Sequence, residues 1–289
     1  MCAGTDYQCR RRVSIVGPAA GRTGMCDDVH VSESHSHTAD EYLMTIWLLA
    51  YPVGEYVPSR RGPQPTAAAR IADQLGVSRA SSGEMLKRLE GEGMVVRGEK
   101  KEAILTEKGR IAAMRVVRRH RLVERLLTDV LGYDGAESHE KADGIDEGFD
   151  EEMVQRLWEK LGRPERCPHG YPIDARHELR ENPTLKPLTR LDEGSKATIV
   201  RLAEHDGDLL RFFYDAELVP GVEVEVVSDN ADGGGAVTIR CGEDELVLTR
   251  EQARGLYARP EGVPVVPADT ACWGSRGTGA AKLTVVSSD

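Results

Sequence analysis

Paired cysteine spacings and long apolar runs are both missing from this sequence of 289 residues. The 6 cysteines show no paired spacing, so neither a disulfide framework nor a zinc knuckle is indicated, and a reducing cytoplasm fits best. No stretch approaches the roughly 20 apolar residues that a membrane span needs, and the N-terminal run lacks an apolar core of signal-peptide length. We therefore expect a cytoplasmic protein with no membrane partner.

Sequence motifs for nucleotide binding and catalysis are also missing. There is no P-loop or dinucleotide fingerprint, and the run from His139 to Lys141 lacks the second histidine of a zincin motif. Because no catalytic base or nucleophile is evident, we expect no enzyme. The enzymatic alternative is a metal hydrolase that uses His120, Glu124 and His139, which would need an open coordination position and turnover.

Charge is distributed unevenly along the chain. The formal net charge is −10, yet residues 66–121 hold 13 Lys and Arg against 7 Asp and Glu. Residues 134–165 hold 4 against 11, and residues 193–257 hold 6 against 14. One basic module followed by two acidic ones predicts that the N-terminal part of the chain binds an anion and that the C-terminal part binds something cationic.

The basic module has the pattern of two helices joined by a tight turn. Ile71, Ala72 and Leu75 recur at helical spacing, Gly76 stands where the first helix ends, and Ser78 can cap the second. Two short strand-like runs follow within residues 95–105, around a charged turn. This order predicts a winged helix-turn-helix, preceded by a helix that Thr38 caps. The alternative is a small α/β packing unit that never meets DNA.

A recognition helix of this kind contacts base edges with residues near its start, while the wing binds phosphate. We expect double-stranded operator DNA as the partner. The predicted DNA-binding residues are Ser78, Arg79, Ala80, Ser81, Glu84, Lys87, Arg88, Arg97, Lys100 and Lys101.

Metal-capable side chains recur at helical spacing in the next block, for which we predict helices over residues 107–130, 136–147 and 151–161. His120 and Glu124 stand four residues apart and share a helix face. A second set, predicted to lie on one face of the following helix, comprises His139, Asp143, Asp146 and Glu147. A cation would relieve the repulsion within such an acidic face, although a solvated acidic face is the alternative. Oxygen-rich donors with one or two imidazoles and no thiolate favour Mn²⁺ or Fe²⁺.

A proline-rich stretch without periodicity follows, and it predicts a linker in which His169 and His177 are loop residues. Beyond it the period changes to two, which predicts a small barrel with strands at residues 197–202, 222–227, 236–241 and 245–248 and a short helix at 208–217.

The predicted fold class is α+β, mostly α. The expected parts are a disordered arm (1–37), the winged helix (38–112), an all-α dimerisation domain (113–172), the linker (173–192), an SH3-like barrel (193–258) and a loose tail (259–289).

Six ordered segments resemble one known family. They are TADEYLMTIW, TAAARIADQLGVSRASSGEMLKRLEGEGMVV, LTEKGR, RRHRLVERLL, SHEKADGIDE and PERCPHGYPI. Together they resemble the diphtheria-toxin-repressor and manganese-transport-regulator family of metal-dependent repressors. The resemblance covers about residues 38–172 and continues more weakly through 193–257. It implies a winged helix, a helical dimerisation domain and an SH3-like barrel similar to the ferrous-transport accessory module.

The resemblance also implies two metal sites per chain for Mn²⁺ or Fe²⁺. One would use His120, Glu124 and His139, and the other would use Glu41, Asp143, Asp146 and Glu147. This chain departs from the family at three of these positions. Asp143 stands where iron-sensing members have a cysteine, and Glu147 stands where the family usually has a histidine. Met44 stands where some manganese-sensing members have a glutamate. The barrel would add a ligand near His205, Asp206 or Asp208, and Asp206 is our choice.

The function that the resemblance implies is a homodimeric, metal-activated repressor of metal-uptake genes. A bound cation would fix the spacing of paired recognition helices by joining the DNA-binding module to the helical domain. The alternative from the residues alone is a winged-helix regulator with an organic effector and no metal switch. That alternative predicts DNA binding that does not depend on metal.

Overall fold

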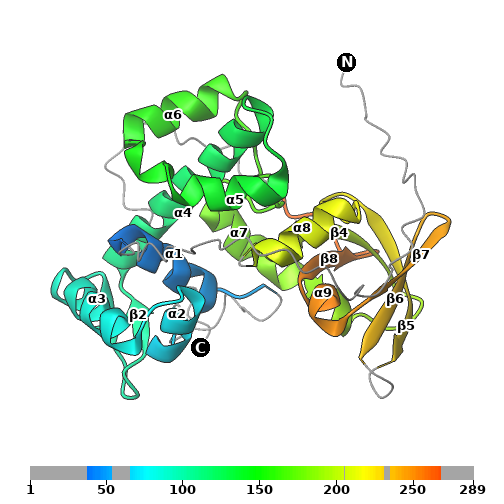
Figure 1. The fold of residues 1–289 in the computed structure, drawn as a ribbon, viewed down its shortest axis with the longest axis horizontal. Helices are drawn as coiled ribbons and strands as arrows, with labels where there is room; N and C mark the ends of the chain where they lie inside the picture. Colours follow the sequence, from blue (N-terminus) through cyan, green and yellow to red (C-terminus); the bar gives the residue numbers. More distant parts are fainter. Residues whose placement is uncertain (1–37, 54–65, 205, 231–234, 268–289) are drawn as a thin grey trace, which may run out of the picture.

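The computed structural model describes residues 38–53, 66–204, 206–230 and 235–267, so the predicted arm and most of the predicted tail lie outside the described residues. The chain mixes helices with two antiparallel sheets (Figure 1). No helix among these residues is long and apolar enough to cross a membrane.

The first part of the chain contains three helices and a hairpin around one core. They are α1 (Ala39–Ala50), α2 (Ala68–Gln74), α3 (Arg79–Gly91), β1 (Val95–Arg97) and β2 (Ala103–Leu105). The predicted caps are confirmed: Thr38 forms a capping box with Glu41, and the Ser78 hydroxyl accepts from the Ser81 amide. Gly76 turns the chain between α2 and α3 at a positive φ of 64°. Trp47 and Leu86 are fully buried where these elements meet.

The middle of the chain is helical. It contains α4 (Glu107–Asp129), α5 (Gly135–Asp143), a 3₁₀ turn η1 (Asp146–Gly148) and α6 (Glu151–Lys160). The prediction of one helix through Glu147 is wrong, because α5 ends at Asp143 with Gly144 as its C-cap. Asp146 and Glu147 therefore lie in η1 and do not continue the face of α5 that carries His139.

The proline-rich segment contains regular structure that its composition does not predict. It forms α7 (Ala175–Glu181) and two 3₁₀ turns, η2 (Asn182–Thr184) and η3 (Leu188–Arg190), with the short strand β3 (Lys186–Pro187) between them. Asp174 caps α7 by accepting from the Arg176 amide, and buried polar side chains hold the helix against its neighbours. Figure 1 shows α7 between the helical block and the sheet.

The last part is a six-stranded antiparallel sheet in the order β3-β8-β4-β5-β6-β7. Its other elements are β4 (Lys196–Leu202), α8 (Gly207–Asp215), β5 (Glu223–Asn230), β6 (Ala236–Cys241), β7 (Asp244–Leu248), α9 (Arg250–Arg254) and β8 (Leu256–Pro260). In the part of the chain that is described, the pairing leaves β3 and β7 as edges, so the sheet is open where we expected a small barrel. β8 was not predicted, although its buried Leu256 and Ala258 alternate as in a half-buried strand.

The sheet packs against the helical block through α5 and α8. Gly135 at the start of α5 lies against the Tyr214 ring of α8, and a Cβ at position 135 would come within 1.9 Å of that ring. Ala136 belongs to the same hydrophobic core as the inner face of the sheet. The two parts therefore share packed surface, which places the end of β4 next to α4 and α5.

Candidate metal centres and DNA-facing surface

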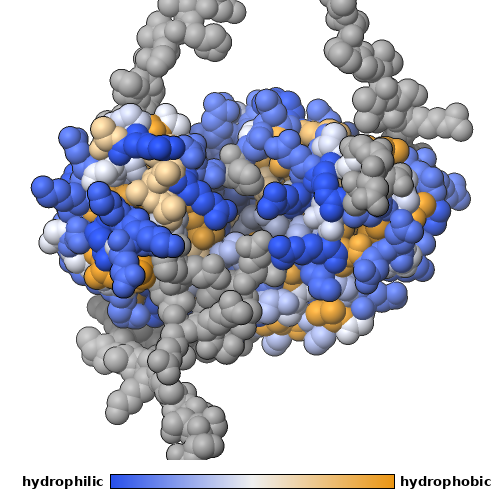
Figure 2. Space-filling model, turned by 90° about the horizontal axis from the view of Figure 1, so that it is seen from below, coloured by the Kyte–Doolittle hydropathy of each residue, from blue (hydrophilic) through white to orange (hydrophobic). Residues whose placement is uncertain are grey.

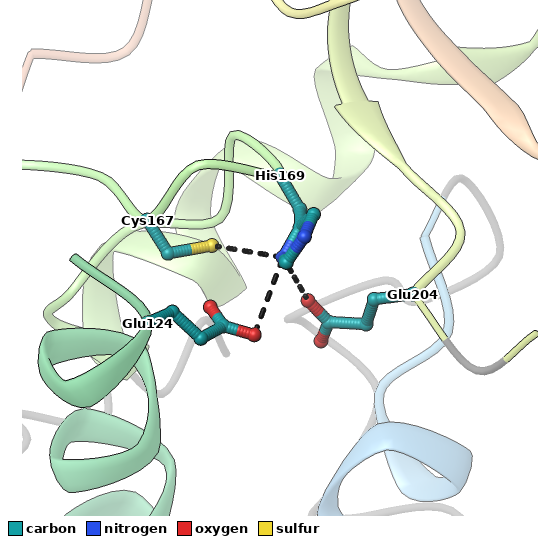
Figure 3. A group of neighbouring side chains, drawn as sticks. All are labelled: Glu124, Cys167, His169 and Glu204. Carbon is teal, nitrogen blue, oxygen red and sulfur yellow. Dashed lines mark hydrogen bonds and ion pairs between the residues drawn. The ribbon is translucent and has the colours of Figure 1, made fainter. Parts of the chain in front are cut away.

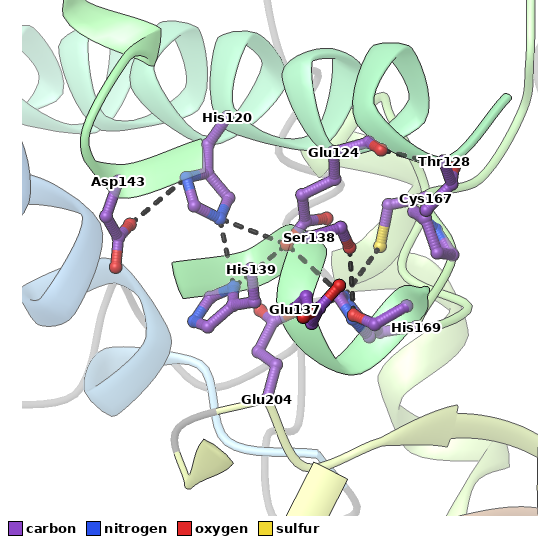
Figure 4. A network of polar contacts seen from close by, with 12 residues as sticks. His120, Glu124, Thr128, Glu137, Ser138, His139, Asp143, Cys167, His169 and Glu204 are labelled. Atoms are coloured by element: carbon purple, nitrogen blue, oxygen red, sulfur yellow. Dashed lines mark hydrogen bonds and ion pairs between the residues drawn. The ribbon is translucent and has the colours of Figure 1, made fainter. Parts of the chain in front are cut away.

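Three of the predicted metal-binding residues meet between α4 and α5. His120 and Glu124 are 2% and 0% exposed. Glu124 Oε1 lies 3.1 Å from His120 Nε2 and 2.8 Å from His139 Nδ1, and the two imidazole nitrogens are 3.0 Å apart (Figure 4). The helical spacing of His120 and Glu124 thus places both donors on the buried face of α4, where α5 adds the third.

Three further residues complete this cluster, and the sequence analysis did not assign them to it. His169 Nδ1 lies 3.2 Å from Glu124 Oε1, 3.9 Å from Cys167 Sγ and 3.7 Å from Glu204 Oε2 (Figure 3). Cys167 and His169 follow α6, and Glu204 follows β4. Cys167 faces the cluster, so the candidate donors include a sulfur atom that the sequence analysis did not count among them. The available signal was the spacing of Cys167 and His169, two residues apart.

The charges in the cluster shift one another's ionisation. Burial alone lowers the pKa of His120 and of His169, but the carboxylate of Glu124 raises both well above their usual value. Burial raises the pKa of Glu124, yet His169 and His120 together lower it well below the usual value. Burial also raises the pKa of the Cys167 thiol. Positive charge at the centre of the cluster therefore stabilises the Glu124 carboxylate.

Two buried carboxylate oxygens in the cluster have no hydrogen-bond partner. They are Glu124 Oε2 and Glu204 Oε2. A buried polar atom without a partner costs about 1–3 kcal/mol, and more when it is charged. A divalent cation would satisfy both atoms, and imidazole, carboxylate and thiolate are common ligands of Fe²⁺ and Zn²⁺. The donor set therefore fits a metal ion.

The other predicted site surrounds a small cavity between α1 and the helical block. Glu41, Asp143, Asp146 and Glu147 all line it, as expected, together with Asp40, Met44, Val116 and Arg119. Its volume of about 10 Å³ is about the room of one water molecule or ion. The structure thus brings the four predicted acidic residues to one place, although they come from α1, α5 and η1.

Hydrogen bonds and ion pairs already engage several carboxylates around this cavity. Glu41 Oε2 accepts from the Thr38 amide at 2.6 Å. Arg119 Nη2 donates to Asp40 at 2.9 Å and lies 3.8 Å from Asp146. Asp143 and Asp146 each lie 3.3 Å from His120 Nδ1. His120 therefore lies between the two candidate centres, with one ring nitrogen directed toward each.

The predicted barrel ligand has a different role in the structure. Asp206 caps α8 by accepting from the Leu209 amide at 3.0 Å, and His205 lies outside the described residues. Glu204, two residues earlier, joins the buried cluster instead. The N-cap position requires the Asp206 side chain to turn back onto its own helix.

A buried network of charged residues connects the candidate centres to the rest of the molecule. Arg201 of β4 donates to Glu181 at 2.5 Å and to Asn182 at 2.6 Å, and Arg166 also pairs with Glu181. Arg121 of α4 pairs with Glu178 of α7 at 2.8 Å. Residues of α4, α7 and β4 are thus joined by ion pairs with little solvent access.

The residues predicted to contact DNA gather on α3 and on the β1–β2 hairpin. Ser78, Arg79, Ala80, Ser81, Glu84, Lys87, Arg88, Lys100 and Lys101 are exposed, and Arg97 is half-buried. Ser82, Leu86 and Leu89 instead point into the core. Arg88 pairs with Glu92 on the exposed surface at 2.9 Å. Figure 2 shows a face of the molecule that is mostly hydrophilic, with only small, separate hydrophobic patches.

Comparison with known proteins places these features in a family. The family model described as "Iron dependent repressor, metal binding and dimerisation domain" matches residues 106–175, and the FeoA domain matches residues 186–260. The iron-dependent repressor IdeR of Mycobacterium tuberculosis is 33% identical over 231 residues, which cover 76% of this chain and 95% of that protein. The chain belongs to the iron-dependent and diphtheria toxin repressor family. This family consists of metal-dependent transcriptional repressors, as its sequence resemblance implied.

Further members of the family extend the comparison. The diphtheria toxin repressor of Corynebacterium diphtheriae is 32% identical, over 70% of this chain and 88% of that protein. A manganese-dependent transcriptional repressor in complex with manganese superposes with a TM-score of 0.65 at 26% identity, covering 77% of this chain and 100% of that one. The structure of T. acidophilum IdeR superposes with a TM-score of 0.62 at 26% identity, covering 78% of this chain and 100% of that one. Both iron and manganese repressors thus share this fold.

Proposed function

We propose that this chain acts as a homodimer that binds operator DNA when Mn²⁺ or Fe²⁺ is bound between α1 and the helical block. The observation that carries the proposal is the small cavity lined by acidic residues from both parts. Glu41 comes from α1, which shares a hydrophobic core with α2 and α3, whereas Asp143 and Asp146 come from α5 and η1. Bound there, the cation supplies positive charge that offsets the repulsion among these carboxylates.

The control of DNA binding follows from this arrangement. Without a cation the carboxylates of α1 and η1 repel one another, and Arg119 offsets only part of that repulsion through Asp40 and Asp146. Holding α1 against η1 fixes α3, because the two helices are packed in one core. A metal can act as effector only as far as it favours the DNA-competent arrangement, and a coupling of about 1–3 kcal/mol is typical.

The DNA-binding surface in this proposal is the exposed face of α3 with the β1–β2 hairpin as a wing. Arg79, Ser81 and Glu84 near the start of α3 would contact base edges, and Lys87, Arg88 and the hairpin lysines would contact phosphates. The helical block, residues 113–172, would join two copies and so set the distance between paired recognition helices. The buried cluster around Glu124 would bind a second cation, as its unpartnered carboxylate oxygens favour.

Titration of labelled promoter DNA with the full chain tests this function. We expect tight binding with added Mn²⁺ or Fe²⁺, with oxygen excluded for iron, and at least tenfold weaker binding with a chelator. Metal-independent binding would support the organic-effector alternative and overturn the proposal.

The Asp143→Asn substitution tests the cavity itself. It removes one negative charge and one carboxylate ligand while keeping the shape, so half-maximal DNA binding should need at least tenfold more Mn²⁺. The matched control is Glu140→Gln, which removes the same charge from an exposed position on the same helix. Equal Mn²⁺ midpoints for Asp143→Asn and the wild type would show that this cavity is not the switch.

A further inference from the structure

The segment that follows the sheet runs back to the short helix α7. The Glu261 amide donates to a carbonyl of β4 at 2.8 Å, and Gly262 then turns the chain at a positive φ of 80°. Farther along, the Val266 carbonyl lies 3.0 Å from Nε2 of His177 on α7. We call residues 261–267 the strap. It is bound to the sheet at one end and to α7 at the other.

The sequence of the strap favours an extended conformation before it makes any contact. Its last five residues are Val-Pro-Val-Val-Pro, in which Val263 and Val266 each precede a proline. A residue before proline is restricted to extended backbone, and proline fixes its own φ. Few conformations are therefore lost when the strap becomes ordered, so a small number of contacts is enough to hold it in place.

Exposure along the strap shows which side of it lies against the protein. Val263 and Val266 are half-buried, whereas Pro264, Val265 and Pro267 are exposed. A spacing of three residues is that of a polyproline II helix, in which every third residue lies on the same face. One side of the strap therefore packs on the molecule and the other side faces solvent.

His177 is the residue of α7 that binds the strap. It is 4% exposed, and burial lowers the pKa of its imidazole, which is therefore neutral at pH 7 with one N–H to donate. Because a carbonyl oxygen only accepts, the proton lies on Nε2 and is donated to Val266. The Val266 carbonyl thus satisfies a buried donor, which would be left without this partner if the strap came away.

The same helix contacts the DNA-binding module. Glu178, the residue after His177, accepts from Trp47 Nε1 of α1 at 3.5 Å. Asn182, the C-cap of α7, donates to the carbonyl of Tyr51, the C-cap of α1, at 3.0 Å. The strap and the C-terminal half of α1 are therefore both bound to α7.

We propose that the strap fixes the position of α7 and thereby holds α1 where the acidic cavity can bind its cation. With only 7 residues, α7 is too short to be stable alone, so it depends on the segments that pack on it. Glu41 is on α1, and a movement of α1 would separate it from Asp143 and Asp146. The inference rests on the proposed function, because the cavity beside α1 is the proposed switch. It gives a role to residues beyond the FeoA domain, which ends at residue 260.

Hydrogen–deuterium exchange of the full, metal-free chain tests the strap without reference to metal or DNA. His177→Leu removes the donor at similar size, and the amides of α7 and of the last turn of α1 should exchange about tenfold faster. His177→Gln keeps an N–H donor near the position of Nε2 and should restore the wild-type exchange. Arg176→Gln is the matched control, because Arg176 is exposed on the same helix and pairs with Asp174.

A second variant loosens the strap and leaves α7 unchanged. Replacing both Pro264 and Pro267 with Gly changes only exposed side chains and removes no hydrogen-bonding group. It increases the number of conformations that the strap must lose on binding, so α7 should again exchange faster. This variant gives the answer if His177→Leu fails to fold.

Mn²⁺ titration followed by electron paramagnetic resonance relates the strap to the cavity, and Asp143→Asn identifies which bound ion is the one in the cavity. His177→Leu and the double glycine variant should each raise the dissociation constant of the cavity about threefold or more, and His177→Gln should leave it unchanged. Unchanged exchange of α7 in both variants, or faster exchange with an unchanged dissociation constant, would overturn the proposal. Neither result bears on the proposed function, which fails instead if the wild type binds promoter DNA without metal.

Discussion

Arg119 places a permanent positive charge beside the cavity where we propose the activating cation. Its guanidinium lies 2.9 Å from Asp40 and 3.8 Å from Asp146, and its side chain is only 15% exposed. Charges this close interact by several kcal/mol where solvent screening is incomplete. Arg119 thus competes with a cation for the same carboxylates and weakens metal binding to the cavity.

Replacing Arg119 with Gln should therefore tighten Mn²⁺ binding. We expect the dissociation constant of the cavity to fall at least tenfold, or about 1.4 kcal/mol, because one repelling charge is removed. Electron paramagnetic resonance of free Mn²⁺ measures this constant directly. Arg115→Gln is the control, since Arg115 lies one turn earlier on α4 and makes only an exposed pair with Glu151. Unchanged or weaker binding in Arg119→Gln would show that the guanidinium does not compete.

Residue spacing predicts only those parts of a metal centre that share an element. His120 and Glu124 could be predicted as a pair because both stand on one turn of α4. Cys167, His169 and Glu204 could not be assigned, because they come from separate segments whose proximity depends on the packing of α8 against α5. Asp206 is the N-cap of α8, a role that an aspartate directly before a helix commonly takes.

At the scale of elements, the caps made the first helices predictable. Thr38 and Ser78 stand where their side chains can accept from the first turn, and both do so. The early end of α5 has a physical reason as well, because Gly144 favours termination over a continued helix. The composition of this segment did not predict α7, because the prolines on both sides of residues 175–181 indicated a linker. The structure has a short helix there, which buried ion pairs stabilise.

The exposed side of α3 permits a test of its role in DNA binding. Arg88→Ala should weaken binding to all DNA sequences severalfold and flatten the salt dependence by about one counterion, because a phosphate contact has no sequence preference. Arg156→Ala is a matched control, since Arg156 forms the same type of exposed pair, with Glu152 on α6. An unchanged salt slope in Arg88→Ala would mean that this part of α3 does not face DNA.

At the scale of the whole molecule, buried ion pairs, cation–π contacts and hydrogen bonds join the three parts of the chain. The centre of the Tyr171 ring lies 5.0 Å from the Arg121 guanidinium and 5.1 Å from the Arg201 guanidinium. Asn182 donates to the Tyr51 carbonyl after α1, at 3.0 Å. Arg201 stands three residues before Glu204 on the same stretch of chain, so the network also positions the sheet's contribution to the metal cluster.

Glu181 links this network to a dependence of stability on pH. Burial raises the pKa of Glu181, but Arg166 and Arg201 outweigh it and lower the pKa from 4.5 to about 2. The folded protein therefore holds this carboxylate ionised at pH values where the unfolded chain protonates it. Its contribution to the free energy of unfolding is complete above about pH 4.5 and is lost as pH falls toward about 2.

Comparing the wild type with Glu181→Gln should reveal this contribution. A shift of this size corresponds to about 3 kcal/mol, and removing one partner of a buried pair costs a similar amount, so the variant should be roughly 3 kcal/mol less stable at pH 7. The difference should shrink as pH falls below about 4.5, because the wild type then loses the same charge. Urea unfolding at a series of pH values measures both curves, with Glu165→Gln, at an exposed position, as the control. A stability difference that stays constant from pH 7 to pH 2.5 would mean that the two arginines do not hold Glu181 ionised, and this ion pair would then not be the source of the pH dependence.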